Sequence, residues 1–192
     1  MILTADTVVT GSELLRPGWI EIRDGRVARV GAGASPRAAD VGLGAVTVVP
    51  GFVDMHTHGG GGGAFPEATA EASEAALALH RRHGSTSMVA SLVAAHPDEL
   101  LREVEVLAGQ VEDGLLAGIH LEGPWMSPHR LGAHELSALR TPDPAEIARV
   151  LDAGRGTIRM VTLAPELDGM MEAIPQFVAG GVVAAVGHTD AT

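Results

Sequence analysis

The fold is decided by residues 46–63, which read Val-Thr-Val-Val-Pro-Gly-Phe-Val-Asp-Met-His-Thr-His-Gly-Gly-Gly-Gly-Gly. An apolar run ends in His56 and His58, and five glycines follow. If the run is extended, both imidazoles leave the same face of a strand, because side chains alternate along a strand. A pair so placed can grip one metal ion. The glycines lack a Walker lysine and a G-x-G-x-x-G context, so they predict a flexible active-site loop rather than a phosphate cradle.

After Pro50 the chain alternates between strand and helix patterns. Alternation of this kind is typical of a parallel sheet. The strands are apolar, as expected for strands buried on both faces. An open doubly wound sheet and a (β/α)₈ barrel both fit. The predicted strands are 52–58, 85–92, 115–122, 158–164 and 182–187, and the predicted helices are 67–83, 97–107, 144–153 and 169–179.

The positions of polar residues favour the barrel. They fall where predicted strands end or just after, as His56 and His58, His120 and Glu122, Glu166, and His188. In a barrel these ends converge at one mouth, where active sites are built. We therefore predict an α/β fold, a partial (β/α)₈ TIM-like barrel with about five of eight strands over residues 50–192. Residues 1–49 form a separate small β unit, with a hairpin turn at Asp24-Gly25.

Composition excludes several functions. The formal net charge is −11, which disfavours nucleic acid and anionic membranes as partners. No apolar run is long enough for a transmembrane helix. The absence of cysteine excludes disulfides and thiolate metal sites, and the absence of lysine excludes Schiff-base chemistry within these residues. With no signal-peptide pattern at the N-terminus, a cytoplasmic protein is the simplest interpretation.

Four of the strand-end residues predict a metal site. His56, His58, Glu122 and His188 would form a nitrogen and oxygen ligand set, which suits Zn²⁺, with Fe, Mn or Co as alternatives. Each has a structural alternative: the histidines as polar or core side chains, and Glu122 as a helix cap or salt-bridge partner. Their coincidence at separate strand ends favours the metal site.

The segment from His120 to His134 combines large apolar residues with residues that can bind a polar ligand. Trp125 and Met126 are expected to form an apolar wall, and Arg130 and His134 are expected to meet a polar or anionic ligand. A solvated surface loop is the alternative.

Other histidines have more ordinary interpretations. His80 and His83 complement the end of a helix, His96 caps the next helix, and His129 remains open.

Five motifs together resemble the N-acetylglucosamine-6-phosphate deacetylases of the amidohydrolase superfamily. The resemblance covers the chain from the β unit to Thr192. The motifs are Pro50-Gly-Phe-Val-Asp-Met-His-Thr-His-Gly-Gly-Gly, His120-Leu-Glu-Gly-Pro-Trp, Gly132-Ala-His, Thr162-Leu-Ala-Pro-Glu and Gly187-His-Thr-Asp-Ala-Thr.

The resemblance implies a role for each matching residue. Glu122 and His188 match metal ligands, and His56 and His58 match the histidine pair of those members that have it, so one or two ions are expected. Ala133 and His134 match a substrate-contacting pair. It also implies a phosphorylated amino sugar as the small-molecule substrate, a homodimer when complete, and a β-sandwich of which residues 1–49 are part.

The chain also departs from the family pattern. A second metal histidine and the catalytic aspartate are expected beyond Thr192, so the chain looks like the N-terminal part of a longer enzyme that is inactive alone. Metal-dependent deacetylation of N-acetylglucosamine 6-phosphate to glucosamine 6-phosphate and acetate is the leading hypothesis. The alternatives are another amidohydrolase acting on a different amide, and a non-catalytic metal-binding fragment.

Overall fold

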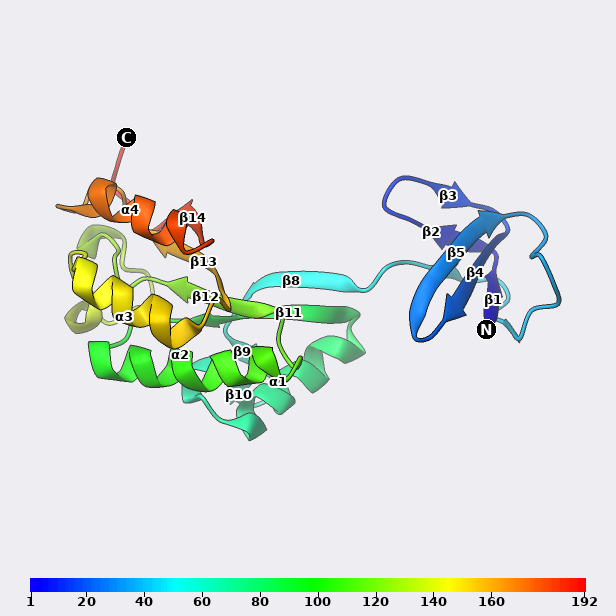
Figure 1. Ribbon diagram of the computed structural model, residues 1–192, viewed down its shortest axis with the longest axis horizontal. Coiled ribbons are helices and arrows are strands. Elements are labelled where there is room, and N and C mark those ends of the chain that lie inside the picture. The colour runs from blue at the N-terminus through cyan, green and yellow to red at the C-terminus, as the bar shows by residue number, and fades with distance from the viewer. The chain divides into compact units, whose positions relative to one another are not determined.

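Two units make up the computed structural model, which describes all residues from Met1 to Thr192. They are Met1–Gly51 and Phe52–Thr192, and Figure 1 shows the elements of each. None of the helices combines the length and the apolarity needed to span a bilayer.

The first unit contains two small sheets. The antiparallel pair of β4 (Gly18–Arg23) and β5 (Arg26–Ala32) is joined by Asp24 and Gly25, whose φ angles are 50° and 73°. Positive φ at both positions is what a tight hairpin turn requires, so the predicted turn is confirmed. The sheet orders are β5-β4-β1-β6 and β3-β2-β7, with β1 (Ile2–Ala5), β2 (Thr7–Val9), β3 (Leu14–Leu15), β6 (Val41–Gly42) and β7 (Thr47–Val48).

The two sheets of this unit meet where β2 crosses β4. A Cβ on Gly18 would lie 2.6 Å from Cγ2 of Val8, so only glycine allows this close approach. Val8 and Trp19 are buried there, and the Arg29 guanidinium lies 5.4 Å from the centroid of the Trp19 ring. The apolar centre of the unit is therefore small.

The second unit is built on a five-stranded parallel sheet of order β14-β13-β12-β11-β8. This order follows the chain without reversal, whereas a doubly wound sheet reverses direction at a switch point. The predicted α/β half-barrel is therefore confirmed, and the doubly wound alternative is wrong. The strands are β8 (Phe52–Thr57), β11 (Ser85–Leu92), β12 (Gly118–Glu122), β13 (Ile158–Leu163) and β14 (Val183–Val186).

Four helices connect these strands and cover the sheet on one side (Figure 1). Sequential right-handed crossovers place consecutive helices on the same face. They are α1 (Ala70–Arg82), α2 (Pro97–Glu112), α3 (Pro144–Gly154) and α4 (Met170–Ala179), and the short 3₁₀ turns are Phe65–Glu67, Pro128–Arg130 and Leu136–Ala138.

Several helix ends differ from the predicted ones. α1 begins at Ala70 rather than at 67, because Ala68 at φ 51° interrupts the chain and Thr69 caps the helix. α2 continues to Glu112. α3 ends at Gly154, one residue later than predicted, and the following Arg155 adopts the left-handed conformation at φ 46°.

Alternation along the strands separates an apolar face from a polar one. Ile119 and Leu121 of β12 lie in the hydrophobic core beneath the helices. The intervening His120 and the terminal Glu122 belong to the opposite face, as does Thr162 of β13. The expectation of strands apolar on both faces is therefore wrong for this inner face, which carries the polar side chains.

The five glycines form a packed hairpin instead of a flexible loop. β9 (Gly59–Gly60) pairs antiparallel with β10 (Gly63–Ala64). A Cβ on Gly63 would lie 2.2 Å from the carbonyl oxygen of Ala72, and one on Gly61 would lie 2.7 Å from that of Ala75. The glycines are needed because the hairpin backbone lies directly against α1.

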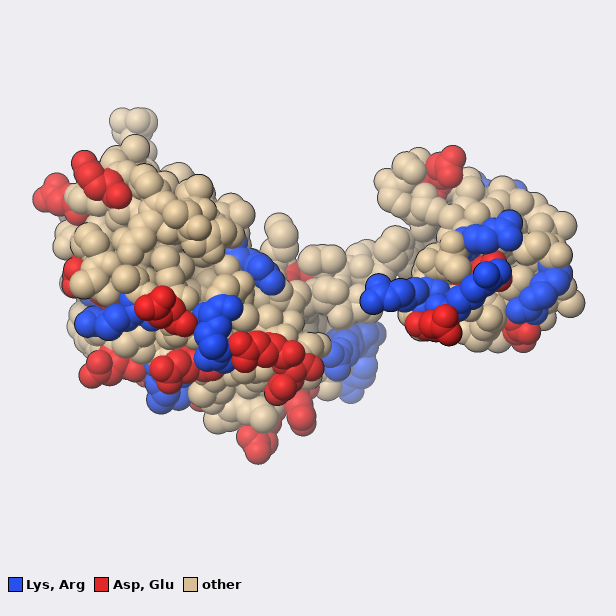
Figure 2. Space-filling view, in the orientation of Figure 1, with Lys and Arg blue, Asp and Glu red and all other residues tan.

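Charges of both signs are interspersed over the helices on the face of the second unit that Figure 2 shows. One ion pair links helix ends, where Arg155 Nε lies 2.7 Å from Glu112 Oε1. Such exposed pairs contribute little to stability. The dense charged contacts of this unit lie instead at the strand ends.

Candidate metal centre

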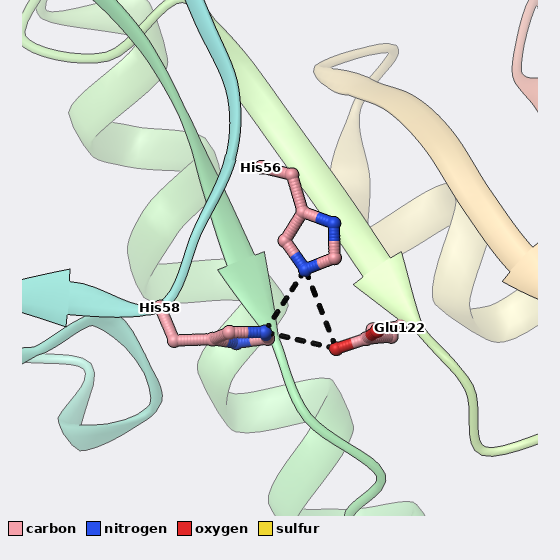
Figure 3. Close-up of side chains that lie close together, drawn as sticks. All are labelled: His56, His58 and Glu122. Atoms are coloured by element: carbon pink, nitrogen blue, oxygen red, sulfur yellow. Dashed lines mark hydrogen bonds and ion pairs between the residues drawn. The ribbon is translucent and has the colours of Figure 1, made fainter. Parts of the chain in front are cut away.

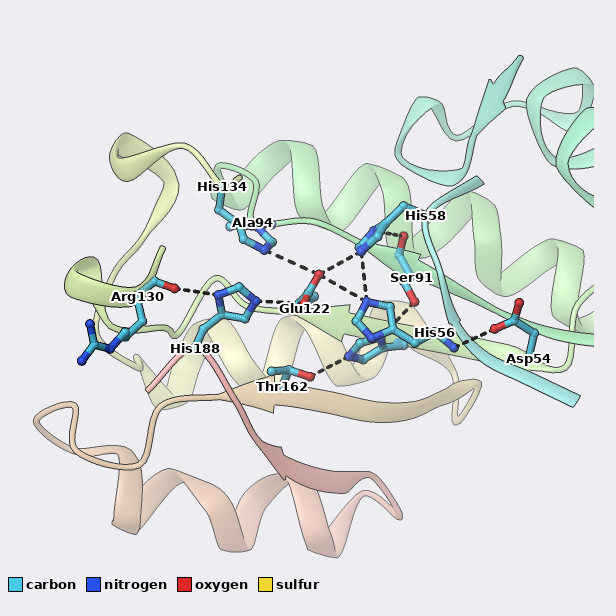
Figure 4. A network of polar contacts seen from close by, with 11 residues as sticks. Asp54, His56, His58, Ser91, Ala94, Glu122, Arg130, His134, Thr162 and His188 are labelled. Atoms are coloured by element: carbon cyan, nitrogen blue, oxygen red, sulfur yellow. Dashed lines mark hydrogen bonds and ion pairs between the residues drawn. The ribbon is translucent and has the colours of Figure 1, made fainter. Parts of the chain in front are cut away.

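The carboxyl ends of the parallel strands bring together all four residues predicted as metal ligands. His56 lies on β8 and His58 directly after it, Glu122 ends β12, and His188 follows β14. Figure 3 shows His56 and His58 directed at Glu122, and Figure 4 shows His188 approaching the same carboxylate. Parallel strands place their ends at one edge, which explains this convergence.

The carboxylate of Glu122 is the centre of the cluster. Its Oε2 lies 2.9 Å from Nε2 of His58 and 3.5 Å from Nε2 of His56, and its Oε1 lies 3.0 Å from Nε2 of His188. The Nε2 atoms of His56 and His58 are 3.1 Å apart. Neighbouring ligand atoms of a tetrahedral site with bonds near 2.1 Å are about 3.4 Å apart, so the spacings among His56, His58 and Glu122 match one shared cation, whereas His188 meets the other oxygen of the carboxylate.

Backbone carbonyls set the orientation of two rings. Nδ1 of His58 lies 3.1 Å from the Ser91 carbonyl oxygen, and Nδ1 of His188 lies 2.7 Å from that of Arg130. A carbonyl only accepts, so each Nδ1 carries a proton and donates. In a neutral ring Nε2 then presents a lone pair to Glu122, and only a proton or a metal cation between the two acceptors makes that contact favourable. The donor set therefore fits a divalent metal.

The electrostatics of the pair support this assignment. When His58 carries a second proton, its Nε2 donates a hydrogen bond to Glu122; that bond, and further interactions with His188 and His56, hold the pKa of Glu122 at about 2 despite partial burial. The same hydrogen bond to Glu122 raises the pKa of His58. Glu122 is thus anionic throughout the neutral range and available as a ligand.

His134 joins the cluster from the loop that follows β12. Its Nε2 lies 3.5 Å from Glu122 Oε2, and its Nδ1 accepts the backbone N–H of Ala94 at 3.1 Å. An accepting Nδ1 places the proton of the neutral ring on Nε2, so His134 presents a donor where His58 presents a lone pair. Burial lowers its pKa and favours this neutral form.

Two groups of potential ligands share Glu122. One consists of His56, His58 and Glu122, and the other of Glu122, His134 and His188. The grouping of His134 with possible ligands was not foreseen from the sequence, which predicted a substrate contact. Its tautomer distinguishes it from His58 and His188, whose Nδ1 atoms donate to backbone carbonyls.

Ala133 and His134 line a cavity of about 490 Å³ beside the cluster. The loops after β8, β11 and β12 surround it. Trp125 and Met126 do not take part. The former packs on Phe177 in the main core, and the latter lies in a small second core, so the expected apolar wall at the mouth is wrong.

His120 supports the cluster from below. It is fully buried, and its ring nitrogens lie 2.9 Å from Ser91 Oγ and 2.8 Å from Thr162 Oγ1. Its ring meets that of His56 edge to face, with ring centroids 4.7 Å apart. Burial lowers its pKa to about 4, so it is a neutral crosslink across three strands. The sequence placed His120 near a strand end. Because it lies two residues before Glu122 on the same strand, its side chain is expected on the same inward face.

The remaining histidines have structural positions. Nε2 of His80 lies 3.0 Å from the Gly59 carbonyl oxygen, which ties α1 to the glycine hairpin. His96 occupies the N-cap position of α2, but its side chain makes no capping hydrogen bond, so that prediction is only half right. His129 is exposed on its 3₁₀ turn.

Comparison with known proteins identifies one consistent group of relatives. The profile of the amidohydrolase family matches residues 47–179. The crystal structure of N-acetyl-D-glucosamine-6-phosphate deacetylase from Mycobacterium smegmatis is 66% identical with a TM-score of 0.98, covering 100% of this chain and 51% of that one. A mutant of that protein in complex with N-acetyl-D-glucosamine-6-phosphate matches equally well, at 66% identity and a TM-score of 0.98, over 100% of this chain and 50% of that one.

A curated relative gives the same result. The N-acetylglucosamine-6-phosphate deacetylase of Bacillus subtilis (strain 168) is 30% identical over 194 residues, which span 96% of this chain and 49% of that protein. The chain thus spans about half the length of the relatives it matches.

Proposed function

The chain belongs to the amidohydrolase family, and from that premise we propose that it carries the metal centre of a deacetylase that acts on N-acetylglucosamine 6-phosphate. The observation that carries the proposal is the Glu122 carboxylate, with imidazole Nε2 atoms from three separate parts of the barrel within 3.5 Å. The deacetylase from M. smegmatis, with 66% identity and a TM-score of 0.98, supports the choice of substrate.

The residues proposed to hold the metal are His56, His58, Glu122 and His188. Zn²⁺ is the favoured ion, since imidazole nitrogen and carboxylate oxygen are its common ligands, and Fe, Mn and Co are alternatives. The two groups that share Glu122 leave room for one ion or two. A divalent cation there supplies Lewis acidity toward an amide carbonyl and toward water.

His134 is proposed to contact the substrate, together with Ala133. Its Nε2–H faces the cluster, because Nδ1 is occupied by the N–H of Ala94. A neutral donor in that place can orient a substrate oxygen without adding charge next to the metal. The cavity beside it offers room for a sugar-sized group.

The proposal also covers partners. A phosphorylated amino sugar is the proposed small-molecule substrate, in line with the M. smegmatis protein solved with that compound. A homodimer, the absence of nucleic-acid and membrane partners, and a cytoplasmic location remain predictions.

A chimeric enzyme tests the function. Residues Met1–Thr192 would replace the matching half of the M. smegmatis deacetylase, whose backbone they follow with a TM-score of 0.98. Acetate release from N-acetylglucosamine 6-phosphate is then measured, with and without prior treatment with a chelator. The chimera should deacetylate this substrate and should lose activity on chelation, regaining it when Zn²⁺ is returned.

The matched control is the same chimera with Glu122→Gln, which keeps the side-chain shape and removes the charge. An active Glu122→Gln chimera, or turnover that chelators leave unchanged, would contradict the proposed metal centre. Turnover of unphosphorylated or cyclic amides with none of the phosphorylated sugar would favour another amidohydrolase. Binding of Zn²⁺ by an inactive chimera would favour a non-catalytic metal-binding role.

A further inference from the structure

A closed ring of polar contacts surrounds His188 on the side away from Glu122. Thr189 Oγ1 donates to Glu166 Oε2 at 2.6 Å, and the backbone N–H of Asp190 donates to Glu166 Oε1, also at 2.6 Å. The Asp190 carboxylate lies 2.6 Å from the guanidinium of Arg130. The Arg130 carbonyl in turn accepts from Nδ1 of His188 at 2.7 Å (Figure 4).

The backbone at His188 needs such support. This residue has φ 49°, in the left-handed region that a side chain with a Cβ seldom adopts. Its carbonyl accepts the N–H of Ser127 at 2.9 Å. The segment after β14 is thus held in an uncommon conformation by contacts with the loops that follow β12 and β13.

Gly132 shows how closely this loop covers the ring. A Cβ there would lie 3.0 Å from Cε1 of His188, and Gly132 itself has φ 60°. The loop therefore leaves the imidazole little freedom to rotate. The loop and the strand end are joined by the hydrogen bonds of His188 with Ser127 and Arg130, and the Glu166–Asp190–Arg130 series of contacts adds a second connection between them.

We propose that Glu166 is a positioning residue for the metal centre, which holds the Thr189–Asp190 segment so that His188 Nε2 points at Glu122. The inference rests on the proposed function, because it gives Glu166 a role in positioning His188, one of the ligands proposed for that site. Glu166 contacts no proposed ligand and no substrate residue, so it acts only through Thr189, Asp190 and Arg130. The hydrogen bonds from Thr189 and Asp190 outweigh a small desolvation effect and lower the pKa of this exposed carboxyl, which keeps the acceptor charged.

The test measures Zn²⁺ affinity of the full chain by competition with a chromophoric chelator, and the visible spectrum of the Co²⁺-loaded protein. Glu166→Gln and Thr189→Val should each weaken Zn²⁺ binding by up to about 10-fold, the lower end of the effect of removing a direct partner of a ligand, because Glu166 acts one contact further from the metal. They should also change the Co²⁺ spectrum, because His188 no longer has a fixed direction.

Two variants serve as controls. Thr189→Ser keeps the hydroxyl that donates a hydrogen bond to Glu166, so this variant should bind Zn²⁺ with wild-type affinity. Glu172→Gln removes an exposed glutamate of α4 outside this network and should change nothing. Glu166→Gln combined with Thr189→Val should weaken binding no more than Glu166→Gln alone, because Thr189→Val removes one of the contacts that Glu166→Gln already weakens.

The outcomes separate the inference from the proposed function. If the wild-type chain binds Zn²⁺ and Glu166→Gln binds it equally well, the positioning role is overturned and the metal centre stands. If the wild-type chain binds no Zn²⁺, both are overturned. A lower melting temperature of metal-free Glu166→Gln with unchanged affinity would indicate a purely structural contact and would also overturn the positioning role.

Discussion

His134 and Ala94 are joined by a hydrogen bond of 3.1 Å from the backbone N–H of Ala94 to Nδ1 of the imidazole. This direction is opposite to that at His58, whose Nδ1 donates to the Ser91 carbonyl. Two rings that face the same carboxylate thus present different atoms to it: a lone pair from His58 and an N–H from His134. The same cluster therefore contains both proposed ligands and a hydrogen-bond donor.

The first prediction separates these roles by metal affinity. His58→Ala and His188→Ala should each weaken Zn²⁺ binding by more than about 100-fold. Each removes a proposed nitrogen ligand, and losing a ligand weakens binding more than losing a group that only hydrogen-bonds to a ligand. His134→Gln should leave affinity within about threefold of wild type, because its Nε2 is protonated and does not ligate. Affinity is measured by competition with a chromophoric chelator.

In the chimeric deacetylase, His134→Gln should lower turnover far more than it lowers affinity for the metal. His129→Gln, at an exposed position in the same loop, is the matched control. A large loss of Zn²⁺ affinity in His134→Gln would show that the imidazole ring of His134 flips and binds the metal. His134 would then be a ligand together with His188, as in the second group of potential ligands.

The second prediction concerns the buried crosslink at His120. Replacing this residue by Leu leaves the hydroxyls of Ser91 and Thr162 without their buried partner. Each unsatisfied group costs about 1–3 kcal/mol, so His120→Leu should lower the free energy of unfolding by about 2–5 kcal/mol. Urea unfolding measures this loss. His129→Leu, the exposed counterpart, should change stability by less than about 0.5 kcal/mol.

The convergence of the four proposed ligands could be predicted from the sequence because it depends on one regular property. Residues at the carboxyl ends of consecutive parallel strands meet at one edge, and alternation tells which of them face inward. His56, His58, Glu122 and His188 all follow from strand boundaries alone. An error of a few residues at the start of β12 did no harm, since the end of that strand was the informative part.

Contacts between distant loops were beyond prediction. The proton position on His134 depends on Ala94, which lies 40 residues away in the chain. The clamp from Glu166 to Asp190 depends on the backbone conformation at His188, which no local pattern indicates. The glycine run at residues 59–63 could not be interpreted from the sequence alone, because glycine suits both a flexible loop and a closely packed backbone. The close contact with α1 makes these residues a packed hairpin.

The third prediction tests that packing. Gly63→Ala would drive a Cβ to 2.2 Å from the Ala72 carbonyl oxygen, so the hairpin or α1 must shift. We expect a loss of about 1–3 kcal/mol in the free energy of unfolding, the usual cost of overpacking. Gly109→Ala in α2 has no atom within 4 Å of the new Cβ and should stabilise the chain by about 0.5–1 kcal/mol. Equal effects of the two changes, measured by chemical denaturation, would refute the packed hairpin.

The last prediction uses the buried carboxyl of Glu103 on α2. This side chain is 2% exposed, and its Oε2 has no hydrogen-bond partner. Burial, together with the nearby Glu99, raises its pKa from 4.5 to about 7. Between these two values the folded chain binds more protons than the unfolded chain, so stability falls as pH rises from 4.5 to about 7 and then levels off.

Glu103→Gln removes this titration while keeping the shape of the side chain. The variant and the wild type should therefore melt at similar temperatures at pH 4.5. At pH 8 the variant should melt higher, on the order of a few °C, because it buries no charge. Glu105→Gln, an exposed change on the same helix, should follow the wild type at both pH values. If the melting temperatures of Glu103→Gln and wild type change with pH in parallel, the prediction is wrong. The charge of buried Glu103 would then be compensated by a partner such as Arg102, whose guanidinium lies 3.9 Å from Glu103 Oε1.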